Sequence, residues 1–259
     1  MKYSIVTICY NAENQISKTI NSVLNLDSIN YEYIIIDGNS TDQTLEIIAS
    51  YEDLFAKKGI IYRYVSENDK GISDAFNKGI MLSSGNYVGL INAGDAICKD
   101  SLNIIDEFAD NDDEIIYGNI LWQDEGRGYS YVRKSQLKVG KLKYEMVIMH
   151  PSVFVLRSLY EKYGGFREDF KYCMDQELLY RFFKNGCKFK YIDRVIAEMC
   201  ADGVSDRKVW PVLVESSKVA RLYHKNNLIT YFFVLYKYLK NRIAHLVRHI
   251  QYGKKIENN

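Results

Sequence analysis

In the stretch YEYIIIDG, residues 31–38, a run of apolar residues stops at Asp37 and Gly38. A short apolar run that ends in turn residues is typical of a strand buried on both faces of a parallel sheet. Helical patterns lie on either side of it, over residues 11–26 and 40–55. This order predicts an α/β protein with a Rossmann-like, mostly parallel central sheet, right-handed connections and helices on both faces.

The alternation of strands and helices continues through the first half of the chain. Further strands are expected at residues 3–10, 60–67 and 87–94, with a helix at residues 71–83. The second half is less regular, and its pattern predicts a hairpin, a strand with a short helix, an amphipathic helix and a last strand. These segments are residues 114–122 with 128–134, 149–166, 175–186 and 188–199.

The composition is that of an ordinary globular protein: 259 residues, 47% hydrophobic and 26% charged, enough for one large domain or two small ones. The five cysteines make an odd number without a C-x-x-C pair, which argues against a disulfide framework or a zinc ribbon and fits a reducing cytosol. The first residues start directly on a strand pattern, and no apolar run reaches about 18 residues. We therefore expect a cytoplasmic protein without a signal peptide or a membrane-spanning helix.

Charge is unevenly distributed, although the net charge is only +1. Residues 218–259 hold nine Lys and Arg against one acid, so this tail carries +8 and the rest of the chain −7. Apolar residues recur in the tail at steps of three and four, which places them in one helical stripe: Leu228, Phe232, Leu235, Leu239, Ile243, Leu246 and Ile250. We expect a basic helical extension that lies on an anionic membrane surface, and no nucleic-acid partner. Packing on its own domain, or on a second subunit of a homodimer, fits the stripe as well.

Acidic residues gather where the predicted strands end. Asp37 follows the second strand, Glu67 and Asp69 follow the third, and Asp95 follows the fourth. Ligands of such sheets bind beyond the carboxyl ends of the strands. A single Asp at a strand end is a turn residue by default, but carboxylates after three successive strands predict one shared ligand-binding crevice.

Six stretches, in this order, carry a resemblance to a known family. They are VTICYN (6–11), IIIDGNSTDQT (34–44), SENDKGISDAFNKGI (66–80), LINAGD (90–95), HPSVFVLRSLYEKYGGFRED (150–169) and MDQELLYRF (174–182). With them, roughly the first two-thirds of the chain resembles the inverting glycosyltransferases of family 2. The most similar subgroup is the bacterial one that builds surface polysaccharides, such as O-antigen and capsule, on a lipid carrier.

The resemblance implies a GT-A fold over residues 1–217, with a nucleotide-binding half (1–115) and an acceptor-binding half (116–217), followed by the tail (218–259). It implies a hexosyltransferase-type enzyme that moves a sugar, in a single inverting displacement, from a nucleotide donor such as a UDP-sugar. The acceptor would be a hydroxyl of a lipid-diphosphate-linked saccharide. The enzyme would then work as a peripheral protein on the inner face of the cell membrane.

The resemblance also assigns donor-binding residues. Asp37 would accept a hydrogen bond from the base of the nucleotide, although a strand-end turn explains this residue too. Asn92 would contact a ribose hydroxyl. The other residues placed at the donor are Thr7, Tyr10, Asn11, Asp69 and Asp74. For Asp74, a place in the first turn of a helix is nearly as good an explanation.

Asp95 matches the last carboxylate of the family's metal-binding D-x-D signature. It would hold Mn²⁺ or Mg²⁺ against the diphosphate of the donor. Many members of the family carry further acids where this chain has Asn92 and Gly94, so strict metal dependence stays open.

Asp175 matches the carboxylate that serves as general base, which must lie within hydrogen-bond reach of the attacking hydroxyl. A role as helix cap competes with this assignment, and Glu177 is the neighbouring alternative base. His150 would lie near the acceptor or the diphosphate, or is simply a packed residue. The stretch DGVSD, residues 202–206, resembles a family loop near the active site.

Two other functions stay open from the residues alone. A nucleotidyltransferase on a related sheet would need a glycine-rich basic loop after the first strand, and the stretch CYNAENQ (9–15) contains none. A non-catalytic binding module is compatible with the missing acids of the metal signature, but the retained carboxylates Asp37, Asp95 and Asp175 argue against it.

Overall fold

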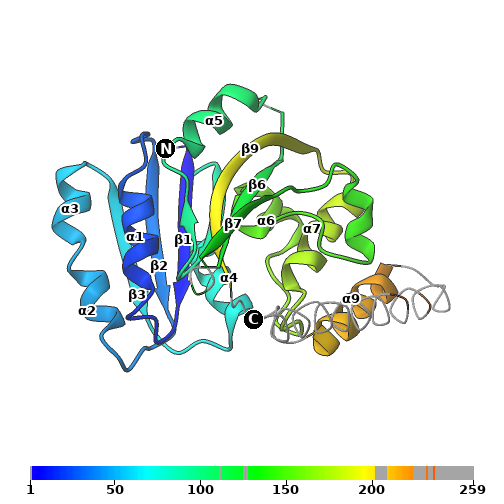
Figure 1. Cartoon of the computed structure of the whole chain (residues 1–259), viewed down its shortest axis with the longest axis horizontal. Helices are drawn as coiled ribbons and strands as arrows, with labels where there is room; N and C mark the ends of the chain where they lie inside the picture. The colour runs from blue at the N-terminus through cyan, green and yellow to red at the C-terminus, as the bar shows by residue number, and fades with distance from the viewer. Residues whose placement is uncertain are drawn as a thin grey trace, which may run out of the picture.

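The computed structural model describes residues 2–110, 112–124, 126, 128–201, 209–223, 232 and 236. Within these residues a single curled sheet of nine strands forms the centre, and helices cover both of its faces (Figure 1). Neighbouring strands follow the order β3-β2-β1-β4-β8-β6-β9-β5, with β7 added beside β6. This is the α/β architecture that the sequence predicts.

The first half of the sheet is parallel. Its strands are β1 (Tyr3–Cys9), β2 (Tyr31–Asp37), β3 (Ile61–Ser66) and β4 (Tyr87–Asn92). The helices between them are α1 (Ile16–Leu24), α2 (Thr44–Ala49), α3 (Glu52–Lys57) and α4 (Ile72–Leu82). Each strand begins within a residue of its predicted start, because a buried parallel strand has the clearest apolar pattern.

The single helix predicted over residues 40–55 is two helices. At the break after α2, the Ser50 hydroxyl donates a hydrogen bond to the carbonyl of Ile47 (2.7 Å). A serine that bonds the backbone of the preceding turn competes with the regular helical pattern. Beyond the break, the Phe55 ring on α3 stacks on Tyr62 of β3, with 4.5 Å between the ring centroids.

The second half of the sheet is mixed. Its strands are β5 (Ala96–Ile97), β6 (Ile115–Asp124), β7 (Tyr129–Arg133), β8 (Val153–Leu156) and β9 (Phe189–Cys200). β8 is antiparallel to both β4 and β6, and β9 runs parallel to β6. β7 forms the predicted hairpin with β6, and β5 pairs antiparallel with β9. β5 has no counterpart in the sequence prediction, because two residues are too few to show a period.

The helical segments of this half are α5 (Ser101–Phe108), η2 (Val139–Lys143), η3 (His150–Ser152), α6 (Arg157–Tyr163), α7 (Met174–Lys184) and α9 (Val209–Tyr223). α9 passes through the boundary predicted after residue 217, and Val219 and Ala220 are fully buried in the core. The loop at 202–206 and the tail beyond Tyr223, apart from residues 232 and 236, lie outside the described residues. In the described part, no helix has the length and hydropathy needed to cross a bilayer.

Two apolar layers hold the sheet between its helices. Because side chains alternate along a strand, β1 sends Val6 and Ile8 into the layer that contains α4 and α7. Its Tyr3 and Ile5 enter the opposite layer, which contains α1 and α5. Every residue of β1 and β2 is buried, as expected for central parallel strands covered on both faces.

A carboxylate lies within this apolar sheet. Glu32 on β2 is fully buried and accepts hydrogen bonds from the hydroxyl of Ser4 (2.7 Å) and from the amide (2.6 Å) and hydroxyl (2.8 Å) of Ser84. Arg63 on β3 adds an ion pair at 3.0 Å. Burial alone raises the pKa of the Glu32 carboxyl, but the hydrogen bonds and the Arg63 charge outweigh it and lower the pKa.

We expect Glu32→Gln to lower the free energy of unfolding at pH 7 by about 1–3 kcal/mol, because charge-assisted hydrogen bonds are replaced by neutral ones. A carboxyl with a lowered native pKa stabilises the fold above its unfolded value of 4.5 and loses that contribution as the pH falls through the native value. The difference in the free energy of unfolding between wild type and Glu32→Gln, measured in urea, should therefore become smaller below pH 4.5. Glu46→Gln, at an exposed position of α2, is the control; a gap that is the same at every pH would contradict the assignment.

Candidate functional site

The carboxyl ends of β1, β2 and β4 meet at one edge of the sheet (Figure 1). Cys9 lies opposite Asp37 in the β1–β2 ladder, and Ile8 lies opposite Asn92 in the β1–β4 ladder. Backbone hydrogen bonds continue for one residue past the ends of β2 and β4. The turns that follow these strands therefore start side by side, at the edge where ligands of such sheets bind.

Asp37 is fully buried at the end of β2. One of its carboxylate oxygens accepts hydrogen bonds from the Ser40 amide (3.0 Å) and from the Ser66 hydroxyl at the end of β3 (2.6 Å). The other oxygen accepts a hydrogen bond from the Ser40 hydroxyl. Asp37 thus has the turn role that the sequence left open. The same donors hold its carboxylate in one orientation, which a binding group also requires.

Tyr10, Asn11 and Asp69 converge on the turn after β2. Asn11 has a φ of 47°, and its amide donates a hydrogen bond to Ser40 Oγ (2.8 Å). A Cβ atom on Gly38 would lie 2.6 Å from Asp69 Oδ2 and 3.4 Å from the Tyr10 ring, so glycine lets both side chains approach the turn closely. Tyr10 is 63% exposed, which leaves most of its ring surface available to a ligand.

The loop between β3 and α4 is held by its own charges. Asp74, in the first turn of α4, accepts a hydrogen bond from the Lys70 amide (3.0 Å). Lys78, one turn further, pairs with Asp74 (3.5 Å) and Glu67 (2.8 Å) and donates to the carbonyl of Asn68 (2.7 Å). Asp74 therefore acts as the helix-start carboxylate that the sequence also allows, and its contact with a donor stays a prediction.

Thr7 lies inside the fold and not at its edge. Its side chain is fully buried, and its hydroxyl accepts a hydrogen bond from the Tyr33 hydroxyl (2.9 Å). By the alternation of β1, Thr7 shares a face with Ile5 and Cys9, which belong to the layer that contains α1 and α5. The predicted contact of the Thr7 side chain with a donor therefore finds no support in this geometry.

Asp95 lies three residues after β4 and is 7% exposed. Its Oδ1 accepts a hydrogen bond from the Cys200 amide at the end of β9 (3.2 Å), and its backbone carbonyl accepts one from the Thr19 hydroxyl on α1 (2.6 Å). Burial raises the pKa of the Asp95 carboxyl to about 6, against the opposing effects of the Cys200 amide, the Asn92 side chain and the Lys18 charge. Asp95 is thus a buried carboxylate at the junction of the two halves of the sheet.

Gly94 lies in the turn directly before Asp95. Gly94 has a φ of +99°, and a Cβ atom there would lie 3.0 Å from Gln15 Oε1. Its amide also donates a hydrogen bond to Thr19 Oγ1 (2.9 Å). A residue with a side chain would be strained at this φ, so the turn favours glycine at this position.

The donor atoms fit a metal ion that is shared with a nucleotide. Within the described ranges, no group of three or more His, Cys, Asp and Glu residues is placed to hold a metal. Mg²⁺ binds through one or two carboxylates together with substrate phosphates and water, and Mn²⁺ prefers the same oxygen ligands. The single carboxylate of Asp95 meets this requirement, whereas a metal site formed before the nucleotide binds does not fit these residues.

Asp175 and His150 form a second group of titratable side chains, beside β4. Because β8 runs antiparallel to β4, the residues just before β8, among them His150, lie beside the carboxyl end of β4. Asp175 lies in the first turn of α7 and accepts a hydrogen bond from the Gln176 amide (2.7 Å). Asp175 and His150 line one small pocket, whose other walls are apolar and include Leu90 and Leu179.

Burial dominates the ionisation of this pair. The His150 ring packs against Phe76 and Phe166, with centroid distances of 5.5 and 6.3 Å. Burial lowers the pKa of His150 and raises the pKa of Asp175, and in each case the charge of the other group opposes burial without overcoming it. A carboxylate of raised basicity beside a neutral imidazole is suited to accept a proton.

Comparison with known proteins identifies the family. The profile described as Glycosyl transferase family 2 matches residues 4–164. The chain belongs to glycosyl transferase family 2. It is therefore a glycosyltransferase that takes its sugar from a nucleotide-sugar donor. Among similar sequences, a PGL/p-HBAD biosynthesis glycosyltransferase of Mycobacterium tuberculosis is 23% identical over 199 residues, which cover 75% of each chain.

Two solved structures share the fold of this glycosyltransferase. Residues 1–349 of S. aureus TarS, in complex with UDP-GlcNAc, superpose with a TM-score of 0.64 at 19% identity, over 85% of this chain and 70% of that one. The mannosyltransferase PcManGT of Pyrobaculum calidifontis, in complex with GDP-Man and Mn²⁺, gives a TM-score of 0.60 at 17% identity, over 78% and 58%. These likenesses confirm the predicted GT-A fold.

This glycosyltransferase uses α9 to fix the start of α7. The carboxylate of Glu215 on α9 accepts hydrogen bonds from the amides of Lys171 (2.9 Å), Tyr172 (2.6 Å) and Cys173 (2.9 Å), which directly precede α7. The first amides of a helix have no partner within it, so Glu215 supplies one next to Asp175. No motif marks Glu215, and an acid on an amphipathic helix is usually a solvated surface residue, so the sequence analysis missed it.

Further contacts attach α9 to the residues after Asp175. The side-chain amide of Gln176 (Nε2) donates a hydrogen bond to the Ser216 hydroxyl (3.0 Å). Glu177 is fully buried, where it pairs with Arg181 (2.9 Å) and accepts a hydrogen bond from the Tyr223 hydroxyl (2.5 Å). Glu177 therefore holds helices together and does not line the Asp175 pocket, which agrees with the choice of Asp175 over Glu177 as base.

We expect Glu215→Ala to lower the free energy of unfolding by about 1–3 kcal/mol, since three amides lose a charged acceptor. Glu215→Gln retains one carbonyl oxygen and should lie between wild type and Glu215→Ala. Urea unfolding followed by circular dichroism measures both changes. Val214→Ala, at a 43% exposed position of the same helix, is the matched control; equal stability of Glu215→Ala and Val214→Ala would disprove the role of Glu215.

Proposed function

We propose that this family 2 enzyme transfers a sugar from a UDP-linked donor, with inversion, to a hydroxyl of a lipid-diphosphate-linked saccharide during the assembly of a bacterial surface polysaccharide. The observation that carries the proposal is the edge of the sheet, where the turns with Asp37 and Asp95 start side by side and the Asp175–His150 pocket adjoins β4. Support also comes from the TarS structure, whose ligand is UDP-GlcNAc, and from the mycobacterial relative, which is named for a biosynthetic glycosyltransferase.

The nucleotide would lie over the turns after β1 and β2. Asp37 would accept a hydrogen bond from the base, because its carboxylate is already oriented by Ser40 and Ser66. The exposed ring of Tyr10 and the backbone of Asn11 would line the same pocket. Further donor contacts would come from Asp69 and Asp74 after β3, and from Asn92, whose amide would reach a ribose hydroxyl.

Asp95 would hold Mn²⁺ or Mg²⁺ together with the diphosphate of the donor. A bound divalent ion supplies charge stabilisation for the departing nucleotide diphosphate. The Asp95 carboxylate would be oriented for this by the Cys200 amide. The charge of Lys18 favours the ionised form of Asp95, and so favours the form that binds a cation.

Asp175 would act as the general base. In an inverting single displacement, the acceptor oxygen forms the new bond to the anomeric carbon as the bond from that carbon to the diphosphate oxygen breaks. The proton of the acceptor hydroxyl would pass to a carboxylate oxygen of Asp175, whose pKa is raised by burial. His150, neutral because burial lowers its pKa, would orient the acceptor or the diphosphate by hydrogen bonding.

The part of the basic extension (218–259) that follows α9 would hold the enzyme against the inner face of the cell membrane, where lipid-linked acceptors reside; residues 218–223 belong to α9. The charge of +8 on the whole extension supports this, since each basic residue near an anionic leaflet adds about 1 kcal/mol to binding. The two halves of the transferase, residues 1–115 and 116–217, would then bind nucleotide and acceptor respectively. A homodimer formed through the apolar stripe is the competing use of the tail.

We expect Asp175→Asn to abolish sugar transfer, with a loss of at least about 100-fold in kcat, because removal of a general base typically costs 10²–10⁴-fold. Binding of UDP, measured by calorimetry, should stay within about twofold, since a base acts after the donor has bound. The acid limb of the kcat profile should lie above the ordinary aspartate value of 3.8, because the base must be ionised and its pKa is raised. If Asp175→Asn kept nearly wild-type turnover, the assignment of Asp175 as the general base would be wrong.

We expect Mn²⁺ to tighten the binding of UDP to the wild-type enzyme and to have little effect on Asp95→Asn, because the variant loses the charged ligand of the ion. Calorimetric titration of UDP, with EDTA and then with Mn²⁺, measures the difference without a need for an acceptor. Asp100→Asn, which changes a nearby carboxylate after β5, is the control and should keep the response to Mn²⁺. A response to Mn²⁺ that survives in Asp95→Asn would place the ion elsewhere.

A further inference from the structure

Three aromatic side chains form a ladder on the β6–β7 hairpin. Trp122 on β6 lies opposite Tyr131 on β7, with 5.3 Å between the ring centroids, and Tyr129 lies 5.6 Å from Trp122. The planes of Tyr129 and Tyr131 differ by only 11°. Although the three rings contact one another, Tyr129 is 49% and Tyr131 48% exposed. An exposed group of large rings on one face is typical of a binding surface.

The two faces of this part of the sheet have different neighbours. Ile196 on β9 belongs to the layer that contains α5. The next residue, Ala197, points to the opposite face and packs with Ile120 of β6 and with Met149. Side chains alternate along β6, so Trp122 lies on the Ile120 face, away from α5.

The aromatic ladder continues this second face toward the tip of the hairpin. Residues that pair across a ladder share a face, so Met199, which pairs with Trp122, lies beside the indole ring. Met149, at the other end of the same face, directly precedes His150. One continuous face therefore leads from the exposed rings to the segment that carries His150.

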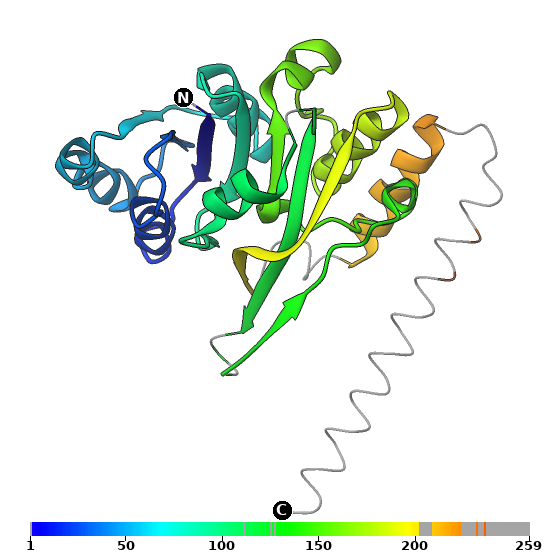
Figure 2. The same cartoon turned by 90° about the horizontal axis from the view of Figure 1, so that it is seen from above.

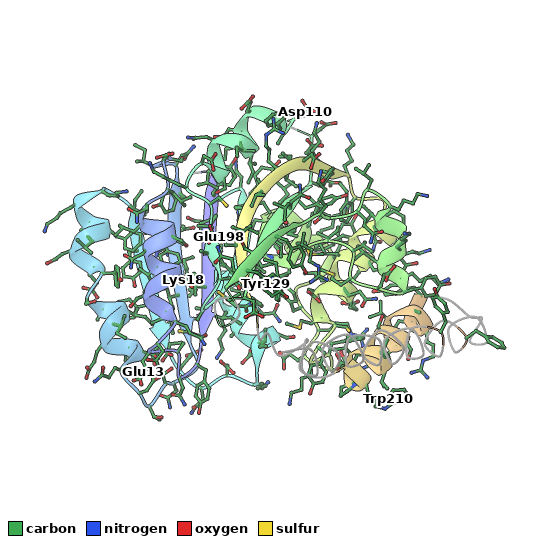
Figure 3. The ribbon with its side chains drawn as sticks, viewed as in Figure 1. Glu13, Lys18, Asp110, Tyr129, Glu198 and Trp210 are labelled. Atoms are coloured by element: carbon green, nitrogen blue, oxygen red, sulfur yellow. The ribbon has the colours of Figure 1, made fainter. Side chains whose placement is uncertain are left out.

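The turn end of the hairpin is held beside the Asp95 turn. Lys18 on α1 contacts the side chain of Gln123 (3.5 Å), and the Ala201 amide donates to the carbonyl of Gln123 (2.7 Å). Cys200, the residue before Ala201, bonds Asp95. Figure 2 shows the hairpin projecting from the sheet on the side of α1, and in the view of Figure 3 the labels of Tyr129 and Lys18 lie next to each other. The ladder thus lies next to residues that contact the Asp95 turn.

We propose that the aromatic ladder binds a pyranose ring of the acceptor saccharide, at a distance from the hydroxyl that reacts. This inference rests on the proposed function, because it assigns the site of the acceptor. One face of a pyranose ring presents C–H groups, which the negative face of an aromatic ring attracts, while the tyrosine hydroxyls remain available to the sugar hydroxyls. Stiff rings also lose little conformational freedom on binding, as in other aromatic recognition surfaces.

A lipid surface is the other occupant that exposed aromatic rings suit. Two observations favour the saccharide. The rings are not at a remote surface but continue the face of Met149, the residue before His150. Gln123, next to Trp122, is bonded to Ala201, and Cys200 before it is bonded to Asp95. A transferase must hold the acceptor beyond its reacting unit, because remote contacts position the hydroxyl for attack.

The chain has two tryptophans, which makes the test direct. In a Trp210→Phe background, Trp122 is the single emitter, and its fluorescence is titrated with soluble trisaccharides of glucose, galactose, mannose and N-acetylglucosamine. At least one trisaccharide should cause a saturable change. Replacing both tyrosines, Tyr129→Ala with Tyr131→Ala, should weaken that binding by about tenfold, whereas the pair Tyr129→Phe with Tyr131→Phe should stay within about twofold.

Val132→Ala is the matched control. Val132 is 48% exposed on β7 but pairs with Leu121, so it lies on the opposite face and its loss should leave saccharide binding unchanged. The proposal is overturned if no trisaccharide changes the emission of Trp122, or if the alanine pair binds as tightly as the phenylalanine pair. It is also overturned if the alanine pair loses binding to phosphatidylglycerol vesicles while saccharide binding is unaffected.

UDP binding, measured in the same variants, separates this inference from the proposed function. UDP affinity should be equal in the alanine pair and in wild type, because the ladder would contact only the acceptor. A protein whose saccharide binding depends on the ladder, but which neither binds UDP nor transfers sugar, would refute the proposed function and leave the ladder as a saccharide site. A protein that transfers sugar with no dependence on the ladder would refute this inference alone.

Discussion

The pairing of β1 with both β2 and β4 is the constraint on which the rest of the structure depends. β1 is buried along its whole length, so each of its amides and carbonyls needs a partner, and an unpaired buried group would cost about 1–3 kcal/mol. The two ladders set the register that brings Asp37 and Asn92 to one edge. A slip of one residue would exchange the faces of β2 and move Asp37 away from its serine partners.

The electrostatic environments differ among four buried or partly buried carboxylates: Glu32, Asp37, Asp95 and Asp175. The differences help to distinguish a carboxylate that stabilises the fold from one that is suited to take part in a reaction. Glu32 receives four hydrogen bonds, one of them from the Gly85 amide, and an ion pair, so its pKa falls and its charge is a fixed part of the sheet. Asp95 and Asp175 have weaker compensation, and burial raises the pKa of both. Groups with perturbed pKa values tend to lie at functional sites. The Asp37 carboxylate is held in place by neutral hydroxyl and amide donors.

The sequence alone was sufficient for the fold and for the edge at which the turns after β1, β2 and β4 meet, because parallel strands buried on both faces have continuous apolar runs that end in turn residues. The sequence was less informative where the direction of a side chain decides whether the residue lies at the site or in the core. Thr7 belongs to a recognisable motif, yet its place in the alternation of β1 turns it into the core. The resemblance marks Gly94 as a missing acid, whereas the structure shows a turn whose positive φ favours glycine. Glu215 acts across more than forty residues of chain, and no local pattern reports such a contact.

The long sequence separation between Glu215 and its partners also matters for the order in which the protein folds during synthesis. A ribosome releases the chain from its N-terminus, so the parallel strands and the nucleotide side of the enzyme emerge long before α9. Until residue 215 appears, the amides ahead of α7 have only water to bond. The hydrogen bonds that fix the start of α7 therefore form only when nearly the whole described chain has been synthesised, long after the first four strands.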